Sequence, residues 1–173
     1  MKTLEELTAL QQDFLDAGYT AEFSFRIACL TLLKKSLKSE FDNDCETADK
    51  AVSEHAKAEI LKHLNTQIRT LQKQHWKGSF LRLFRRIFQR ENQAECPAEC
   101  PAGLHPAIIP IRNDFSYIYA LTEAISQGQC AILIASSETT EMNELARVII
   151  EDNFTEDFVA FYTPSEAVGE MKP

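Results

Sequence analysis

The chain has 173 residues, a net charge of −8 and five cysteines. Its apolar fraction of 45% and charged fraction of 25% are ordinary for a globular protein and exclude a wholly disordered chain. The 26 acidic residues against 18 basic ones exclude nucleic acid as the expected partner. No run of about 18 apolar residues is present, and the start Met-Lys-Thr-Leu-Glu-Glu is not a secretion signal, so we expect a cytoplasmic protein with free thiols.

The first part of the chain predicts helices. Thr3 and Glu6 have the spacing of a capping box, and apolar residues then recur every three or four positions until Gly18. Two further apolar stripes predict helices, one from near Thr20 to Phe41 and one from Val52 to Leu71. Three such helices could form an antiparallel bundle.

A basic amphipathic helix is expected next. The stretch from Lys73 to Arg90 contains six basic residues and no acid, while Phe, Leu and Ile recur every three or four residues from Phe80 to Phe88. The favoured interpretation is that this helix packs on the acidic remainder of the same chain. The alternative is binding to an anionic membrane surface or in a partner's groove. The candidate contact residues are Arg82, Arg85, Arg86 and Arg90.

Residues 91–106 have the character of a linker. Ala94-Glu95-Cys96-Pro97 is repeated at once as Ala98-Glu99-Cys100-Pro101, and the prolines discourage regular structure. Cys96, Cys100 and His105 are possible zinc ligands, but a closed structural zinc site needs four ligands. We therefore interpret the segment as a duplicated loop and expect no metal.

The last third alternates between strand and helix patterns. Strands are expected near 107–111, 130–135 and 158–162, with helices near 115–127 and after Ser136 or Ser137, and the middle strand is apolar enough to be buried on both faces. This order predicts an α/β fold, in which N-terminal helices precede a partial Rossmann-like parallel sheet with flanking helices. The expected organisation is a helical region 1–90, a linker 91–106 and a partial dinucleotide-binding-like region 107–173.

Motifs that carry chemistry are scarce. The sequence has no Gly-x-Gly-x-x-Gly, no Gly-x4-Gly-Lys-Ser/Thr and no Gly-x-Ser-x-Gly. The four histidines are scattered, and Cys130 opens a strand that is expected to be buried, where a cysteine packs as a small apolar residue. From these residues we predict no catalytic group.

One long stretch resembles a known family. The segment Ile118-Tyr119-Ala120-Leu121-Thr122-Glu123-Ala124-Ile125-Ser126-Gln127-Gly128-Gln129-Cys130-Ala131-Ile132-Leu133 is similar to the aldehyde dehydrogenase helix and strand that end in A-I-A-A-G-N-x-V-V-x-K-P-S-E. The following Ser-Ser-Glu-Thr-Thr-Glu-Met-Asn-Glu-Leu-Ala resembles that family's next helix start, and the order of the N-terminal helices is also similar. The resemblance covers most of this chain and about the first third of a full-length enzyme.

The resemblance implies a cofactor corner that this sequence has altered. The family's Lys, which reaches the adenosine ribose of NAD or NADP, is replaced by Ile134 or, with a one-residue gap, by Ala135. Ser136 and Glu138 are the candidates that retain the rest of that corner. Asn113 is the candidate for the family's oxyanion-stabilising Asn.

The tail resembles the family's cofactor-phosphate turn, Y-T-G-S-T-x-V-G-K. It supplies Ser165 and Gly169 as further cofactor-binding candidates, although the tail also fits an alignment in which this match is fortuitous. Glu166 and Glu170 add negative charge where a pyrophosphate would bind. We therefore expect no cofactor, with only weak NAD or NADP binding as the alternative.

The family's catalytic Cys and general-base Glu would lie beyond Pro173. The expectation is a truncated, aldehyde-dehydrogenase-like protein without independent oxidoreductase activity, which acts as a binding or assembly module by self-association or by docking onto a full-length relative. One alternative is a peripheral membrane or partner-binding protein that uses residues 80–90. Another is an NAD(P)-dependent aldehyde oxidoreductase subunit completed by another chain.

Overall fold

The computed structural model describes residues 2–43, 54–88 and 104–164, and the side chains of all of these except residues 43 and 78–88. The helices and strands follow one another in an N-terminal helical part and a mixed part. In chain order they are α1 (Leu4–Asp16), the 3-10 helix η1 (Tyr19–Ala21), α2 (Phe23–Asn43), α3 (Glu54–Phe88), β1 (Ala107–Pro110), α4 (Ser116–Gln127), β2 (Ala131–Ile134), α5 (Thr140–Glu151) and β3 (Val159–Tyr162).

The three strands form one parallel sheet in the order β1-β2-β3. The register pairs Ala107 with Ala131 and Val159 at one end of the sheet, and Pro110 with Ile134 and Tyr162 at the other. The central strand is buried on both faces from Ala131 to Leu133, as its continuous apolar run predicted. The predicted α/β class with a partial Rossmann-like sheet is confirmed.

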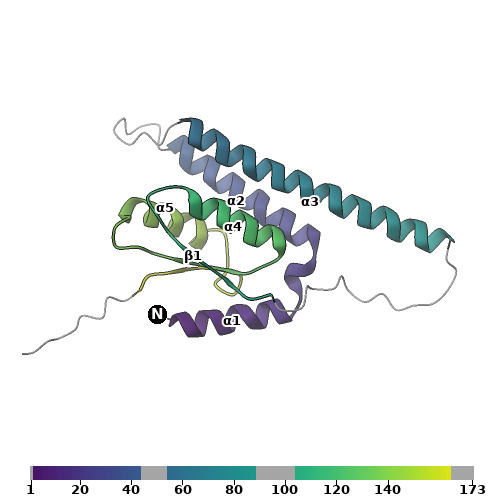
Figure 1. Cartoon of the computed structure of the whole chain (residues 1–173), viewed down its shortest axis with the longest axis horizontal. Coiled ribbons are helices and arrows are strands. Elements are labelled where there is room, and N and C mark those ends of the chain that lie inside the picture. The colour runs from purple at the N-terminus through teal and green to yellow at the C-terminus, as the bar shows by residue number, and fades with distance from the viewer. Residues whose placement is uncertain (1, 44–53, 89–103, 165–173) are drawn as a thin grey trace, which may run out of the picture.

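Helices cover both faces of the sheet (Figure 1). The crossover helices α4 and α5 lie on one face, and α2 and α3 form a further layer outside them. On the other face lies α1, whose buried Leu7 packs against Ile132 and Ala160. The expected three-helix bundle was therefore wrong, because the apolar stripe of α1 is used to cover the sheet rather than to pair with α2 and α3.

The N-terminal helix is held on the sheet by one buried polar side chain. α1 begins with the predicted capping box, in which Thr3 and Glu6 bond each other's backbone N–H groups. In its middle, the fully buried Gln11 donates from Nε2 to the carbonyl oxygens of Ala131 at 2.9 Å and Glu156 at 3.2 Å. Gln11 thereby bonds α1 to the start of β2 and to the loop before β3.

The outer layer is a long antiparallel helix pair. The predicted helices before and after residue 73 are one continuous helix, α3, of 35 residues. Its buried side chains pack on α2, and burying a Leu or Ile of this kind contributes about 1.5–3 kcal/mol. The buried apolar side chains of the pair are Leu30, Leu33, Leu37, Phe41, Ile60, Leu64, Ile68 and Leu71. None of the helices in the described ranges, α3 included, has the apolar length needed to cross a membrane.

Candidate functional site

The carboxyl edge of the sheet is the place where a parallel α/β fold binds ligands. Because Pro110, Ile134 and Tyr162 are in register, the loops after β1 and β2 and the residues after β3 all leave the sheet at this edge. The loop after β1 carries Asn113, and the loop after β2 carries Ser136 and Glu138. The structure therefore brings the described candidate residues to one edge of the sheet.

The loop after β2 is closed by an amide side chain from α5. Asn143 Oδ1 accepts hydrogen bonds from the Ser136 backbone N–H at 3.2 Å and from Thr139 Oγ1 at 3.2 Å. Asn143 Nδ2 donates to the Ser136 carbonyl oxygen at 2.6 Å. The backbone N–H of Glu138 donates to Ser136 Oγ at 3.4 Å. Ser136, Thr139 and Asn143 are thus bonded to each other, and the Glu138 side chain is exposed.

Sequence reasoning missed Asn143 and misplaced the helix start. Helix α5 has Thr139, not Ser136 or Ser137, as its N-cap residue. Thr139 is buried at 5% exposure, and its side chain makes no capping bond to the helix. The available signal was an Asn four residues after Thr139 and seven after Ser136, because Asn side chains readily bond nearby backbone groups.

The loop after β1 is exposed. Asp114 accepts from the backbone N–H of Ser116 at 3.1 Å and from its hydroxyl, and these bonds lower the pKa of the Asp114 carboxyl. The neighbouring Asn113 is an exposed residue in a bend. An oxyanion-stabilising amide must lie beside the reacting thiol, but Cys130 immediately precedes β2 and so lies at the opposite edge of the sheet.

The described thiols are not nucleophiles at neutral pH. Burial raises the pKa of Cys29 to about 11. Burial, with a smaller contribution from the charge of Asp157, raises the pKa of Cys130 to about 12. A thiol with such a pKa is protonated at neutral pH, whereas the thiolate is the reactive form. Cys45, Cys96 and Cys100 lie outside the described residues.

The described loop after β2 presents no basic side chain to a dinucleotide. Ile134 and Ala135, which stand where the family resemblance puts a Lys, offer only apolar side chains, and the Ala135 N–H is bonded to the Tyr162 carbonyl oxygen at 2.8 Å. From Ile134 to Asn143 the sequence has the acids Glu138 and Glu141 and no base, so a phosphate would meet negative charge there. Ser165 and Gly169, with Glu166 and Glu170, lie outside the described residues.

A hollow of about 630 Å³ lies elsewhere, at the corner between α1 and α2. It is lined by Phe14, Ala17, Gly18, Tyr19, Glu22 and Phe25. Phe14 and Phe25 contact Phe158, just before β3, so this corner belongs to the amino edge of the sheet. The hollow is therefore remote from the loops that carry the candidate site.

The other residues that the sequence singled out lie away from the carboxyl edge or outside the described set. In the described ranges no three His, Cys, Asp or Glu side chains gather to hold a metal ion. His105 lies near α1, with its Nδ1 3.2 Å from Gln12 Oε1. The backbone at Arg82, Arg85 and Arg86 belongs to α3, but their side chains lie outside the described set, as does the whole of Arg90.

Comparisons with known proteins show the fold. The structure is similar to a substrate-bound AldH from Staphylococcus aureus, with a TM-score of 0.64 and 16% sequence identity. The similarity covers 94% of this chain and 36% of that protein, so this chain spans about a third of its length. No protein-family model and no curated protein matches the sequence. The fold is therefore similar to that of part of an aldehyde dehydrogenase, in agreement with the family resemblance of the sequence.

Proposed function

We propose that this chain is an assembly module with an aldehyde-dehydrogenase-like fold and without dehydrogenase activity of its own, which associates with a second copy through the free edge of β3. The observation that carries the proposal is that β3 is paired on one side only: β2 lies along one edge, and no described strand lies along the other. An unpaired strand edge is a template for pairing with another chain.

The chemistry of the described residues supports the absence of independent activity. Burial keeps the described thiols protonated at neutral pH, and in the loop after β2 the Ser136 N–H is bonded to Asn143 and the Glu138 N–H to Ser136. A covalent aldehyde intermediate needs a thiolate, and hydride transfer needs a bound nicotinamide. The described residues supply neither requirement.

The two edges of the sheet differ in their capacity to pair. In β1 and just after it, the N–H groups of Ala107 and Ile111 donate to the carbonyl oxygens of Cys130 and Ile134. The backbone N–H and C=O groups of the odd-numbered residues therefore point toward β2. Because this direction alternates along a strand, the backbone of Pro110 points away from β2, and proline has no N–H to donate there. The β1 edge is therefore less able to pair with another strand. In β3, by contrast, the backbone of Phe161 faces outward and has both an N–H donor and a C=O acceptor.

Sedimentation velocity over a range of concentrations tests this proposal. We expect a reversible dimer. The matched variants Phe161→Ala and Phe161→Pro distinguish the contribution of the aromatic side chain from that of the backbone N–H. Both variants lose the aromatic side chain, but only proline removes the outward N–H. The alanine variant should dimerise and the proline variant should be monomeric with the same far-ultraviolet circular dichroism. A wild-type chain that stays monomeric throughout would refute the proposal.

A second candidate is an oxidoreductase subunit completed by another polypeptide. The observation that favours it is the similarity to AldH over only 36% of that protein, which leaves most of that protein without a counterpart here. Mixing this chain with a candidate partner should then produce aldehyde oxidation that neither chain shows alone. A complex that forms without activity would support the assembly role instead.

A further inference from the structure

We propose that the outer face of α3 binds the surface of an anionic lipid bilayer, with Trp76 as its interfacial anchor. This face is defined by Lys62, Arg69, Lys73, Trp76 and Lys77, all exposed and all described. It lies outside the carboxyl edge and the β3 edge, so the inference does not depend on the proposed function. Charge, exposure and the position of α3 in the fold support it.

The charge of α3 is segregated along the sequence. From Ile60 to Arg90 there is no Asp or Glu, although the whole chain has 26 and a net charge of −8. Within the described side chains this run carries Lys62, Arg69, Lys73 and Lys77. A stretch of this length without an acid, in an acidic chain, concentrates positive potential on one element.

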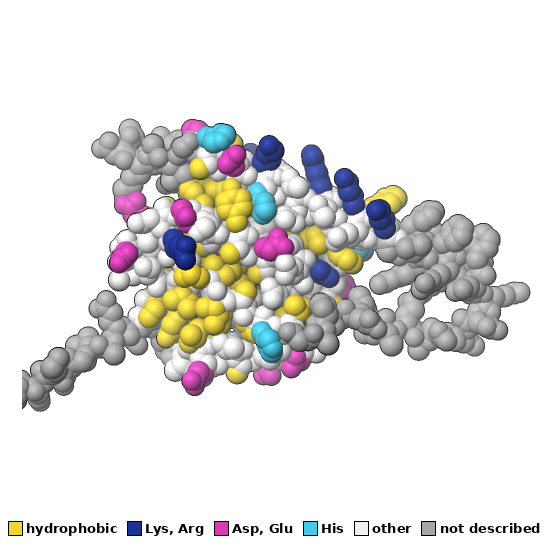
Figure 2. All heavy atoms as spheres, viewed as in Figure 1, with side chains coloured by type: hydrophobic (Ala, Val, Ile, Leu, Met, Phe, Trp, Pro, Cys, Tyr) yellow, Lys and Arg dark blue, Asp and Glu magenta, His cyan; other side chains and the backbone are white. Residues whose placement is uncertain are grey.

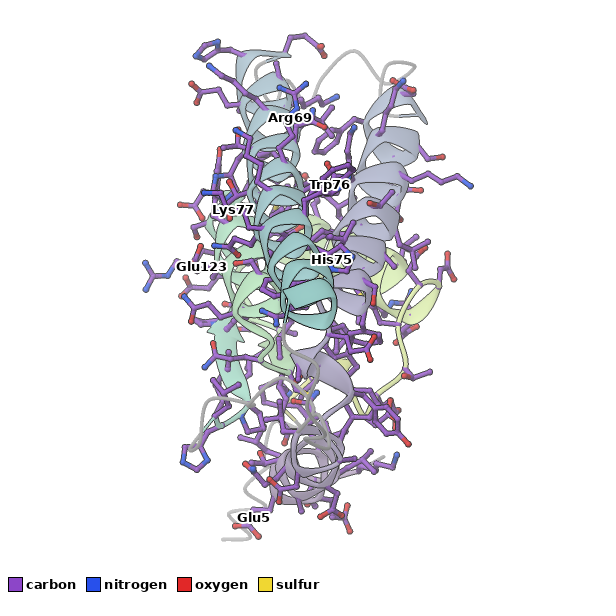
Figure 3. The ribbon with its side chains drawn as sticks, turned by 90° about the vertical axis from the view of Figure 1, so that its right-hand side faces the viewer. Glu5, Arg69, His75, Trp76, Lys77 and Glu123 are labelled. Atoms are coloured by element: carbon purple, nitrogen blue, oxygen red, sulfur yellow. The ribbon has the colours of Figure 1, made fainter. Side chains whose placement is uncertain are left out.

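The geometry of the helix gathers these cations on one side. At 3.6 residues per turn, Arg69, Lys73 and Lys77 succeed one another on the side of α3 opposite the buried stripe that includes Leu64 and Leu71. Figure 2 shows Lys and Arg side chains in a row along α3, while acidic side chains lie along the lower edge of the molecule and also elsewhere on this face. Figure 3 shows Arg69 and Lys77 on α3, and Glu5 far from them on α1.

The cations do not link the described elements to one another. None of the four has a side-chain hydrogen bond or ion pair with another described residue. Nearby Glu123 is bonded instead to two glutamines, accepting from Gln67 at 3.4 Å and from Gln127 at 2.7 Å. Positive charge on this face is therefore free to meet an external anionic surface.

An aromatic side chain distinguishes a bilayer from other anionic partners. Trp76 is the single tryptophan of the chain and is 76% exposed within this cationic face. Exposed Trp flanked by Lys and Arg suits the headgroup region, where the ring is partly buried and its N–H remains hydrated.

The position of α3 makes this face accessible. Phe23, the first residue of α2, has its ring 6.3 Å from that of His75, and α3 continues from there to Phe88. The end of α3 that follows Trp76 thus extends past the start of α2, and it projects from the body of the protein (Figure 1). A flat surface can approach this end without displacing another described element.

The emission of Trp76 tests the proposal directly, because no other tryptophan contributes. Vesicles of phosphatidylcholine and phosphatidylserine in about equal amounts should shift the emission to the blue and protect it from aqueous quenchers, and the effect should be lost when salt is raised from about 0.1 M to about 0.5 M. Vesicles of phosphatidylcholine alone should have no effect. If poly-glutamate shifts the emission and the anionic vesicles do not, the partner is an acidic polypeptide and the proposal is wrong.

Matched variants locate the surface by vesicle sedimentation. Lys73→Glu with Lys77→Glu should weaken binding at least about tenfold, whereas Lys35→Glu with Lys38→Glu, an equal charge change at exposed positions of α2, should not. Trp76→Ser should weaken binding several-fold, and Tyr19→Ser, at the other large exposed aromatic among the described residues, should have no effect. An equal loss of vesicle binding in the two charge-reversal variants would show that binding depends on the net charge of the protein and not on this face, and it would overturn the proposal. Because self-association through β3 is measured without lipid, either proposal can fail alone.

Discussion

Gly128 lies directly against the backbone of Thr20, so that a methyl group on Gly128 would come within 2.9 Å of the Thr20 carbonyl oxygen. Gly128 ends α4 with a φ of 79°, which disfavours any side chain. This contact joins the turn before β2 to η1, and Arg26 reinforces it by donating from Nη1 to the Ser126 carbonyl oxygen at 3.1 Å. The helical part and the mixed part of the chain are thus in direct backbone contact.

Gly128→Ala should therefore destabilise the protein by about 2–5 kcal/mol, the sum of left-handed backbone strain and a backbone clash. Gly18 is the matched control, because its φ is 78° but nothing lies within 4 Å of an added Cβ. Gly18→Ala should cost only the strain, about 1–2 kcal/mol. Urea unfolding of both variants measures the difference, and equal losses would show that the Thr20 contact has no effect on stability.

The buried Gln11 predicts a second stability effect. Gln11→Leu removes the donor for the Ala131 and Glu156 carbonyl oxygens and should destabilise the fold by about 1–3 kcal/mol. Gln12→Leu, at the adjacent half-buried position, should cost less, because Gln12 bonds Asp16 on the surface and Leu104 at 3.4 Å. The free energy of unfolding in urea provides the test. A larger loss for Gln12 would contradict the role given to Gln11.

Asn143 should determine the order of the loop after β2. Asn143→Ala removes the three hydrogen bonds that the side chain makes with Ser136 and Thr139, and we expect a loss of about 1–3 kcal/mol. Asn113→Ala, at an exposed position in the loop after β1, should change stability by less than about 0.5 kcal/mol. Amide hydrogen exchange of residues 136–139 should accelerate only in the Asn143 variant. Unchanged exchange there would refute the role given to this side chain.

The buried thiols predict a loss of stability at alkaline pH. The ordinary pKa of a Cys thiol is near 9, and burial raises that of Cys29 to about 11 and that of Cys130 to about 12. Above pH 9 the unfolded chain releases these protons and the folded chain keeps them, so the free energy of unfolding must fall as pH rises from 9 toward 11 and 12. Below pH 9 the full stability is present, because the folded and the unfolded chain both keep these protons.

Urea unfolding at about pH 8 and about pH 10 measures this effect. A Cys29→Ala and Cys130→Ala double variant should lose less stability between the two pH values than the wild type does. The comparison is made between the two slopes, because truncation of the side chains changes stability at both pH values alike. An identical pH dependence in the two proteins would be inconsistent with buried, protonated thiols.

Much of the fold could be predicted from local patterns. The capping box at Thr3, the apolar run before Ile134 and the glycine stop at Gly128 are all signals within a few residues, and all three were confirmed. The position of α1 could not be predicted, because an apolar stripe shows that a helix is half-buried and does not show which surface it covers. Only the contact of Leu7 with Ile132 and Ala160 identifies the sheet as its partner.

The candidate site was harder to predict than the fold. The family resemblance named Ser136 and Glu138, and the structure puts both in the loop after β2 at the carboxyl edge, since parallel strands share one direction. The sequence did not reveal that Asn143 would bond the loop internally, because that depends on how α5 starts after Thr139. The family resemblance suggested an altered cofactor corner at these residues, and its weak or absent cofactor binding stays a prediction.

Calorimetric titration of the purified protein with NAD and with NADP tests the central claim most directly. A chain whose carboxyl edge carries Glu138, lacks a described cation between Ile134 and Asn143 and bonds its own loop should give no binding heat with either dinucleotide. Dissociation constants above about 1 mM agree with an assembly module without its own cofactor. Binding tighter than about 100 μM, a free energy of about 5.5 kcal/mol, would contradict it.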